Sequence, residues 1–433
     1  MTKFQTVVIG VFLVCIVVGL ILLSTYKGGS SATDLPAITI WGTIPSQTFT
    51  NFLAETKKVY ANNYQITYVQ KSEKTFNSEL ISALANGESP DAVLAPYEII
   101  SSQEGKYATI PYATFPERNF RDMFLQEGEM FLGPSGVVAI PFSVDPLVMY
   151  WNKDIFSNVG RASYPTTWTE FQTLANKITV RDDASNISRS AVAFGEWRNV
   201  TNAKEIFSAL LFQDGDPVSV RSGTTFASVL GTVMTSRNVS SAEEALNFYT
   251  SFSNPTKQVY SWNRSLPQSK TYFIAGNLGT YFGFASEFSD IRDKNPNLNF
   301  DIAPIPQIEK GNTRATYGKM IAFAYPKMAK NANAAYQMTL SFLDPTVAPI
   351  WSKITYLPPV RKDLLSAGTT DPYQAIFYDS AIISHGWLDP NSLYSAQILQ
   401  DLIESYTSGK DVAQVLINRA RDQLNNLGGT GTN

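Results

Sequence analysis

Residues 140–156, "IPFSVDPLVMYWNKDIF", decide the fold more than any other stretch of this 433-residue chain. The segment is hydrophobic and strand-like, but Pro141 and Pro146 interrupt it, and a proline cannot donate to a strand ladder. We therefore expect the chain to cross between two lobes here rather than to form a central strand. Asp145 stands alone among residues suited to burial, and by itself it fits a helix cap, an ion-paired structural residue or a catalytic acid.

The chain before this stretch alternates strand and helix patterns. "AITIW" (37–41), "QITYV" (65–69) and "DAVLA" (91–95) have strand character. The segments between them, near residues 46–61 and from Phe76 to Gly87, place their apolar residues on one helical stripe each. This alternation is typical of parallel βαβ units.

Ligands of open α/β sheets bind beyond the carboxyl ends of the strands, where loops lead toward helix N-termini. In this chain those ends are residues 41–44, 71–73 and 96–98. Side chains in these short segments are therefore candidates for ligand contact.

The part that follows is mostly helical, then mixed, then helical again. One helix opens with a Ser-x-x-Glu capping box, either Ser240/Glu243 or Ser241/Glu244. "NFDIAPIP" (299–306) and "GKMIAFAYP" (318–326) are strand-like, and the last 40 or so residues carry helical patterns. "DGDP" (214–217) and "GEWRN" (195–199) lack spaced partners for catalysis, so we expect turn and loop roles.

Composition excludes several classes of function. The formal net charge is −3 and the basic residues are scattered, which argues against nucleic-acid binding. The single cysteine, Cys15, lies in an apolar run, so the remaining chain has neither a disulfide nor a catalytic thiol. His385 is the single histidine, and we expect it in a solvated loop. "AGNLGTYFG" lacks the strand–GxGxxG–helix order of a dinucleotide site, and no cofactor or metal is expected.

The N-terminal segment differs in kind from the rest. Residues 4–26 carry no charge, which is long enough to cross a bilayer. A cleaved signal peptide is the alternative, but no small-x-small cleavage site follows the apolar run. We therefore predict that residues 1–35 form an uncleaved anchor and linker, with the body on the extracytoplasmic side of the cell membrane.

The opening stretch continues into "SNVGRASYPTTWTEFQTLANKIT" (157–179), and together they resemble a known family. A proline-marked strand, Asn-Lys-Asp-Ile-Phe, a glycine and Pro-x-Thr-Trp-x-Glu-Phe occur in the order found in the extracellular solute-binding proteins of family 1. These are receptors of ABC importers and include the maltose-binding type. "SPDAVLAP", "FIAGNLGTYFGFASEF" and "LPPVRKDLL" also match, and the resemblance runs from about residue 38 to 427.

The resemblance implies an α/β fold of the two-lobe periplasmic-binding-protein type (type II), with hinge strands between the lobes and closure over a ligand. Lobe I would hold residues 36–144 and 313–358, and lobe II residues 145–312 and 359–427. Residues 428–433 would be a disordered tail. A membrane-anchored, non-enzymatic, monomeric receptor for a small solute would follow, with separate ABC permease subunits as partners.

The resemblance also places candidate contact residues near the cleft, with Ser143 and Asp145 on its floor. Aromatic faces suit sugar rings, although Phe284 stands near the position where the family's sugar binders often carry a tryptophan. The candidate ligand contacts are Trp41, Thr43, Tyr97, Ser143, Asp145, Phe284, Ser286, Tyr317, Tyr356 and Trp387. A sugar or oligosaccharide is the favoured solute. An anchored carbohydrate-active hydrolase, or a sensing or adhesion receptor with the same fold, remains an alternative.

Overall fold

The structure is a computed structural model, and it describes residues 35–59, 64–184, 186–223, 225–234, 238–311 and 313–429. The predicted membrane anchor falls almost entirely outside these residues. None of the helices in the described ranges is long and apolar enough to span a bilayer.

Lobe I is built on the three strands that the sequence predicts. β1 (Ala37–Gly42) lies between β2 (Gln65–Gln70) and β3 (Ala92–Pro96), and all three are parallel. The helices α2 (Ser46–Val59) and α3 (Phe76–Ala85) connect them. The buried side of α2 places Phe52 against Trp351, with ring centroids 5.3 Å apart, so the apolar stripe of this helix packs into the core as expected.

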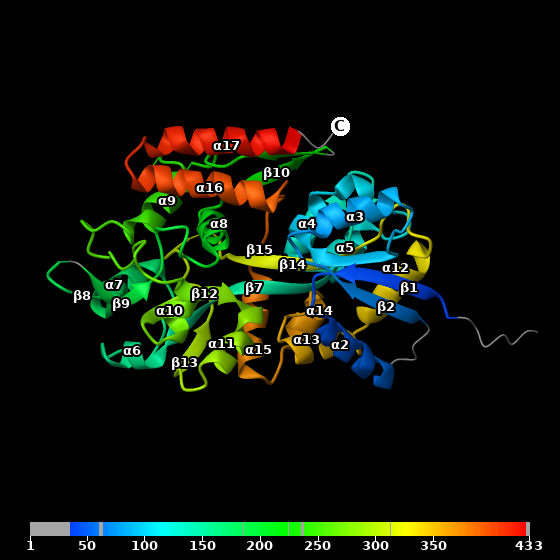
Figure 1. Cartoon of the computed structure of the whole chain (residues 1–433), viewed down its shortest axis with the longest axis horizontal. Helices are drawn as coiled ribbons and strands as arrows, with labels where there is room; N and C mark the ends of the chain where they lie inside the picture. The colour runs from blue at the N-terminus through cyan, green and yellow to red at the C-terminus, as the bar shows by residue number, and fades with distance from the viewer. Residues whose placement is uncertain are drawn as a thin grey trace, which may run out of the picture.

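The strand β7 (Ile140–Asn152) joins the two lobes, and all of its 13 residues are buried. Its first half pairs with β14 (Thr316–Ala324), ending at Pro146 opposite Gly318. From Leu147 onward its neighbours are β12 (Leu278–Phe284) and β13 (Phe300–Ala303). The pairing thus changes from one lobe to the other within a single strand, as Figure 1 shows.

The expectation that this stretch would not form a central strand is wrong. The main sheet has the order β2-β1-β3-β14-β7-β12-β9-β8, and β7 lies in its interior. Both prolines occupy positions that tolerate a missing N–H group. The register shifts beside Pro141, where Ile321 and Ala322 pair with Ser143 and Pro141, and Pro146 lies where the neighbouring strands change.

Lobe II is formed around β12, β9 (Ile187–Val192) and β8 (Val180–Arg181). Its core is aromatic: Phe194 lies 4.9 Å from Phe282 between ring centroids, and Trp168 stacks on Phe282 at 5.8 Å. The helices on this side are α6 (Lys153–Ser157), α7 (Trp168–Ile178), α10 (Ser269–Ile274) and α11 (Phe288–Lys294).

A helical layer lies over lobe II and reaches toward lobe I (Figure 1). It contains α8 (Ala203–Gln213), α9 (Ser241–Ser251), α16 (Ser392–Thr407), α17 (Ala413–Gly429) and the hairpin of β10 (Ser219–Ser222) and β11 (Thr225–Ser228). The buried Asp216 accepts the N–H groups of Val218 and Gly231 at 2.9 and 2.7 Å, so "DGDP" has a structural role. α17 extends two residues into the predicted tail, and residues 430–433 lie outside the described ranges.

Shorter elements complete both lobes. They are α4 (Tyr97–Ser101), α5 (Glu117–Met123), α12 (Ala332–Phe342), α13 (Ala348–Thr355), α14 (Lys362–Ala367), α15 (Pro372–Ile382), the sheet of β4 (Ile110–Pro111), β5 (Leu132–Gly133) and β6 (Gly136–Val137), and β15 (Ser384–His385). α14 packs on α5, and α15 contacts β7, β13 and β14. The residue boundaries assigned to the lobes stay a prediction.

Of the two serines that the predicted capping boxes offer, Ser240 is the N-cap of α9. The Ser240 hydroxyl accepts the N–H of Glu243 at 3.2 Å and caps the helix. Ser240→Ala should lower the free energy of unfolding by about 1 kcal/mol, because the first turn loses a partner for this N–H group. Urea denaturation measures the difference, and Ser240→Asp, which keeps a capping oxygen, should recover most of it. An alanine variant as stable as wild type would exclude the capping role.

Candidate ligand site between the lobes

Segments from both lobes and from the crossing strands converge beside β14. α4 follows directly after β3 and contributes Glu98, while β14 itself contributes Tyr317. α8 of the helical layer contributes Lys204, and the segment after β15 contributes Trp387 and Asp389. Residues far apart in sequence therefore meet where the chain passes between the lobes.

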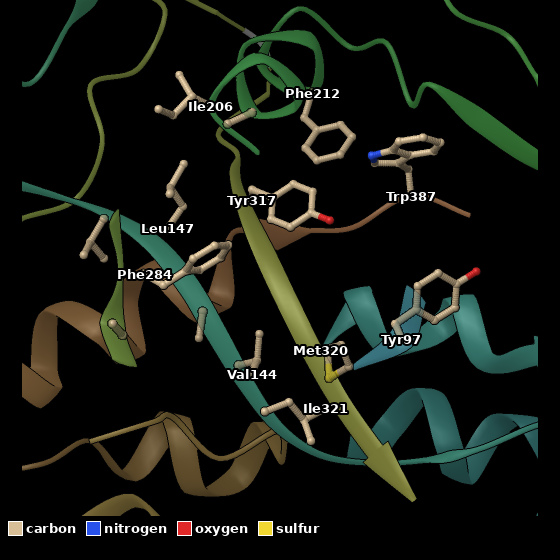
Figure 2. Close-up of a cluster of buried hydrophobic side chains, with 14 of the residues drawn as sticks. Tyr97, Val144, Leu147, Ile206, Phe212, Phe284, Tyr317, Met320, Ile321 and Trp387 are labelled. Atoms are coloured by element: carbon tan, nitrogen blue, oxygen red, sulfur yellow. The ribbon is translucent and has the colours of Figure 1, made fainter. Parts of the chain in front are cut away.

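Tyr317 lies at the centre of this group and is almost completely buried. Its hydroxyl donates a hydrogen bond to Glu98 Oε1 at 2.9 Å. Its ring stacks on Phe212 at 6.2 Å between centroids, and Phe284 meets it edge-on at the same distance. Figure 2 shows these rings together with Trp387 in one buried cluster. Burial raises the pKa of Tyr317 far above its ordinary value, so the hydroxyl acts as a neutral donor.

Lys204 and Asp389 form a buried ion pair in the same region. Lys204 Nζ also donates to Ser392 Oγ at 3.0 Å, and it lies 5.3 Å from the ring centroid of Trp387. Burial alone would lower the pKa of Lys204, but the charges of Asp389 and neighbouring glutamates raise it. The lysine is therefore a cation whose charge is already matched within the protein.

Asp145 is buried at the point where β7 changes neighbours. Its Oδ1 accepts the N–H of Ser286 at 3.0 Å, which ties β7 to the turn after β12. Burial raises the pKa of Asp145 to about 6, against the lowering effect of Ser286 and of Lys319 opposite it on β14. Ser143 lies nearby and donates to the Pro358 carbonyl at 3.3 Å. Both residues thus lie at the lobe crossing.

Acidic groups surround Lys319. Its ammonium lies 3.3 Å from Glu73 Oε1. Burial alone would lower the pKa of Lys319, but Glu73 and the carboxylates of Glu98, Asp145 and Glu205 raise it. Carboxylates therefore outnumber ammonium groups at the lobe junction.

Several predicted contact residues lie apart from Tyr317 or face another way. The Tyr97 hydroxyl points away from Tyr317 in Figure 2. Trp41 is half-buried under the Lys71 ammonium, 3.9 Å from the ring centroid, and Thr43 is half-buried beside it. Tyr356 packs against Phe288 at 5.4 Å. Ligand contact by these residues stays a prediction.

The charged residues of the site other than Asp145 were not selected from the sequence. Glu73 and Glu98 lie at two of the three strand ends that the sequence marks, so a signal for them existed. Lys204 and Asp389 are 185 residues apart, and no local pattern pairs them. A charged residue inside an apolar helix is the single hint for Lys204.

The expectation of a solvated loop histidine is also wrong. His385 lies in β15, pairs with Tyr317 on β14 and is half-buried. Its ring is 5.9 Å from that of Phe212, and burial lowers its pKa. The pairing of β15 with β14 brings His385 into the protein interior. A strand of two residues has no recognisable sequence pattern, so this position could not be predicted.

A further ionic contact spans the lobes at the hairpin. Arg221 of β10 donates to both carboxylate oxygens of Glu104 at 3.1 and 3.2 Å, and to the Met130 carbonyl at 3.1 Å. This two-pronged geometry fixes orientation better than a single contact. Within the described ranges, no group of three His, Cys, Asp or Glu residues is arranged to hold a metal ion.

The sequence profile of the family described as "Bacterial extracellular solute-binding protein" matches residues 48–376. With the two-lobed fold and the buried polar site, this match defines the class: the chain belongs to the extracellular solute-binding protein family. The predicted resemblance is thereby confirmed. The family and its solved relatives are binding proteins and not enzymes, which also confirms the expected non-enzymatic role.

Solved structures share the fold over nearly the whole chain. A cyclic alpha-maltosyl-1,6-maltose binding protein from Arthrobacter globiformis has a TM-score of 0.70 at 18% identity, covering 90% of this chain and 99% of that one. A cyclo/maltodextrin-binding protein complexed with maltotetraose has a TM-score of 0.68 at 14% identity, covering 90% and 96%. An ABC substrate-binding protein from Listeria monocytogenes in complex with cycloalternan has 0.65 at 16%, covering 92% and 100%.

Proteins of Brucella abortus named as binding proteins are 25% identical over 240 residues. The match covers 54% of this chain and 53% of theirs, so the chain spans about half the length of the curated relatives it matches. Their names specify no ligand.

Proposed function

We propose that this protein is the solute-binding receptor of an ABC importer and captures a sugar or oligosaccharide between its two lobes. One observation carries the proposal: aromatic rings and incompletely paired polar groups meet where the chain crosses between the lobes. The Trp387 indole nitrogen and Glu98 Oε2 are buried without a hydrogen-bond partner among the described residues. Buried polar groups normally have partners, and a bound solute would supply them for these two groups, which lie beside the aromatic rings of the lobe junction.

Two kinds of contact would give such a site useful affinity. Micromolar binding needs about 8 kcal/mol of net free energy. The rings of Phe212, Tyr317 and Trp387 supply apolar faces, and Glu98 and Asp145 supply oxygen acceptors for solute hydroxyl groups. Structural relatives solved with maltotetraose or cycloalternan, or named for binding cyclic alpha-maltosyl-1,6-maltose, support the same class of solute.

A thermal-shift screen of the purified chain tests this function. Sugars, oligosaccharides, amino acids, polyamines and metal complexes would be offered one at a time, since a ligand that binds only the folded state raises the melting temperature. A shift with sugars and not with the other classes is expected. If the shifts come from another class, or if oligosaccharides are cleaved on incubation, the proposal fails.

The N-terminal segment would hold the receptor at the cell surface as a single-pass anchor, from which the monomeric body delivers its solute to separate permease subunits. Residues 4–26 are uncharged and long enough for this task. Membrane fractionation of the full chain against a variant lacking residues 1–34 tests the anchor. A full chain that washes off membranes as easily as the truncated one would exclude it.

Asp145→Ala should weaken ligand binding at least about tenfold, equal to about 1.4 kcal/mol, while changing stability less. The buried carboxylate orients the turn at Ser286 and can accept solute hydroxyls, whereas its own burial opposes its contribution to folding. Titration calorimetry and urea denaturation measure the two effects. Asp344→Ala is the matched control, since that aspartate also accepts a backbone N–H group, from Thr346 at 2.8 Å, outside the site. A larger loss of stability than of binding would make Asp145 a structural residue.

A further inference from the structure

The site between the lobes carries more negative than positive charge. Lys319 is the ammonium group whose pKa responds to Glu73, Glu98, Asp145 and Glu205 together. Only Glu73 of these four forms an ion pair with it. Lys204, the second lysine, is committed to Asp389 and Ser392. Arg221 is likewise committed, to Glu104. Within the described part of the chain, these three cations form their ion pairs with other carboxylates than Glu98.

Glu98 is the carboxylate with a free oxygen at the centre of this charge. Its Oε1 is held by the Tyr317 hydroxyl, and its Oε2 is buried with no hydrogen-bond partner among the described residues. The Tyr317 ring is fixed between Phe212 and Phe284, so the carboxylate is held in one orientation. An incompletely paired buried carboxylate is costly, and a hydrogen-bonding cation offsets that cost best.

Trp387 provides an independent observation that points to a ligand. Its side chain is 3% exposed, yet its indole N–H has no acceptor among the described residues. In Figure 2 this nitrogen is turned toward Phe212, inside the cluster that contains Tyr317. Trp387 and Glu98 both lie near Lys204. The ring centroid of Trp387 is 5.3 Å from the Lys204 ammonium, and the charge of Glu98 raises the pKa of Lys204. A donor that lacks an acceptor therefore lies in the same site as an acceptor that lacks a donor.

One kind of solute completes all of these groups. An oxygen atom of the solute would accept from the Trp387 N–H group, and the apolar face of its ring would pack on the aromatic side chains. A neutral hydroxyl group could donate to Glu98, but it would leave the surplus negative charge in place. A protonated amino group would donate to Glu98 and also offset that charge.

We propose that this receptor prefers an amino-substituted sugar over its neutral counterpart, and that Glu98 is the residue that determines this preference. The inference rests on the proposed sugar-binding function and narrows its class of solute. Glu98 accepts from Tyr317 at one oxygen and from the solute ammonium at the other.

Matched sugars test the preference directly. Titration calorimetry on the full chain would compare cellotriose, the β-1,4-linked trimer of glucosamine and its N-acetylated form, with the pairs glucose and glucosamine, and galactose and galactosamine, beside them. In each set the molecules differ only in the substituent at C2 of each ring, and only the amine is charged. Wild type should bind an amino sugar at least about tenfold more tightly than its neutral and acetylated counterparts, or about 1.4 kcal/mol.

Glu98→Gln keeps an acceptor for Tyr317 and removes the charge. It should lose about tenfold in affinity for the amino sugar while its affinity for the neutral sugar stays within about twofold. Glu55→Gln, on the exposed side of α2, is the matched control and should change neither. An unchanged melting temperature of Glu98→Gln would show that the fold is intact, and the wild-type comparison stands without any variant.

The outcomes separate this inference from the proposed function. Wild type that binds neutral sugars as tightly as amino sugars would overturn the preference and leave sugar binding intact. Equal losses for both kinds of sugar in Glu98→Gln would show that Glu98 positions the site and does not select charge. Binding of none of these sugars, with a response to another solute class in the thermal-shift screen, would overturn both.

Discussion

Lys204→Met is expected to lower the free energy of unfolding by about 3 to 5 kcal/mol, because it leaves the Asp389 carboxylate buried without its counter-ion. Asp389 is 1% exposed, and its remaining partners are the Ser395 hydroxyl at 2.7 Å and the Asn391 N–H group at 3.0 Å. Two neutral donors do not replace an ammonium group. Urea denaturation at pH 7 measures the loss, with an unchanged dependence on urea concentration showing that the folded state is intact.

Two further variants establish that the loss comes from a stranded charge. Lys204→Met combined with Asp389→Asn removes both charges and should recover most of the stability. Arg198→Ala breaks an ion pair with Glu404 in which the arginine is 69% exposed, and it should cost less than about 1 kcal/mol. A Lys204→Met protein no less stable than Arg198→Ala would mean that water reaches Asp389 in solution.

The Lys204–Asp389 ion pair lies where lobe I meets the helical layer. Lys204 belongs to the helical layer over lobe II, and Asp389 lies on the segment that follows β15. Asp389 also receives the Ser101 hydroxyl of α4 at its carbonyl oxygen, at 2.9 Å. Contacts from lobe I and from the helical layer therefore converge on one residue. We expect any change in the angle between the lobes to change the contacts of Asp389.

The sequence predicted the strands and helices of lobe I well because their patterns are local. β1, β2 and β3 are short apolar runs, and α2 and α3 carry regular stripes, so each element is determined by its own residues. β7 was the exception. Its prolines suggest a break in the strand. They are tolerated because of the strands that lie beside β7, and these neighbouring strands are segments more than 100 residues away in the sequence.

The lobe crossing was predictable from the sequence, whereas the charge network beside it was not. Asp145, Ser143 and Tyr317 lie at the lobe crossing, as the resemblance implied, and Glu98 follows a marked strand end. Which carboxylates are paired depends on side-chain geometry across lobes. Tyr317 and Glu98 are separated by 219 positions, so a single sequence contains no pattern that joins them.

Raising the pH from about 5 to 8 should destabilise wild type relative to Glu127→Gln by about 3 to 4 kcal/mol. Glu127 is 4% exposed, and burial raises its pKa from 4.5 to about 8, against the lowering effect of its hydrogen bond from Ser384. The folded state therefore keeps this proton where the unfolded chain has released it. The stabilisation is complete below about pH 4.5 and is lost as the pH rises toward 8, at 1.36 kcal/mol per unit of pKa difference.

The surroundings of Glu127 explain why no cation compensates for its burial. A Cβ atom at Gly318 would lie 2.2 Å from Glu127 Oε2, so β14 passes close against the carboxyl group. Glu98, the nearby charged group that acts on it, raises its pKa further. The pKa of Asp145 is also raised, to about 6. Its titration gives wild type and Glu127→Gln the same additional dependence of stability on pH, so only the difference between the two proteins reports on Glu127.

Urea denaturation of wild type and Glu127→Gln at pH 5, 6.5 and 8 gives that difference. Glutamine keeps an acceptor for the Ser384 hydroxyl and cannot ionise, so the two free energies should diverge steadily as the pH rises. Asp145→Asn should reduce the common slope below pH 6 in both backgrounds and leave the divergence near pH 8 unchanged. Parallel curves for wild type and Glu127→Gln would mean that Glu127 is ionised in the folded protein. In that case β14 and β15 would have to admit water or a cation at the lobe crossing.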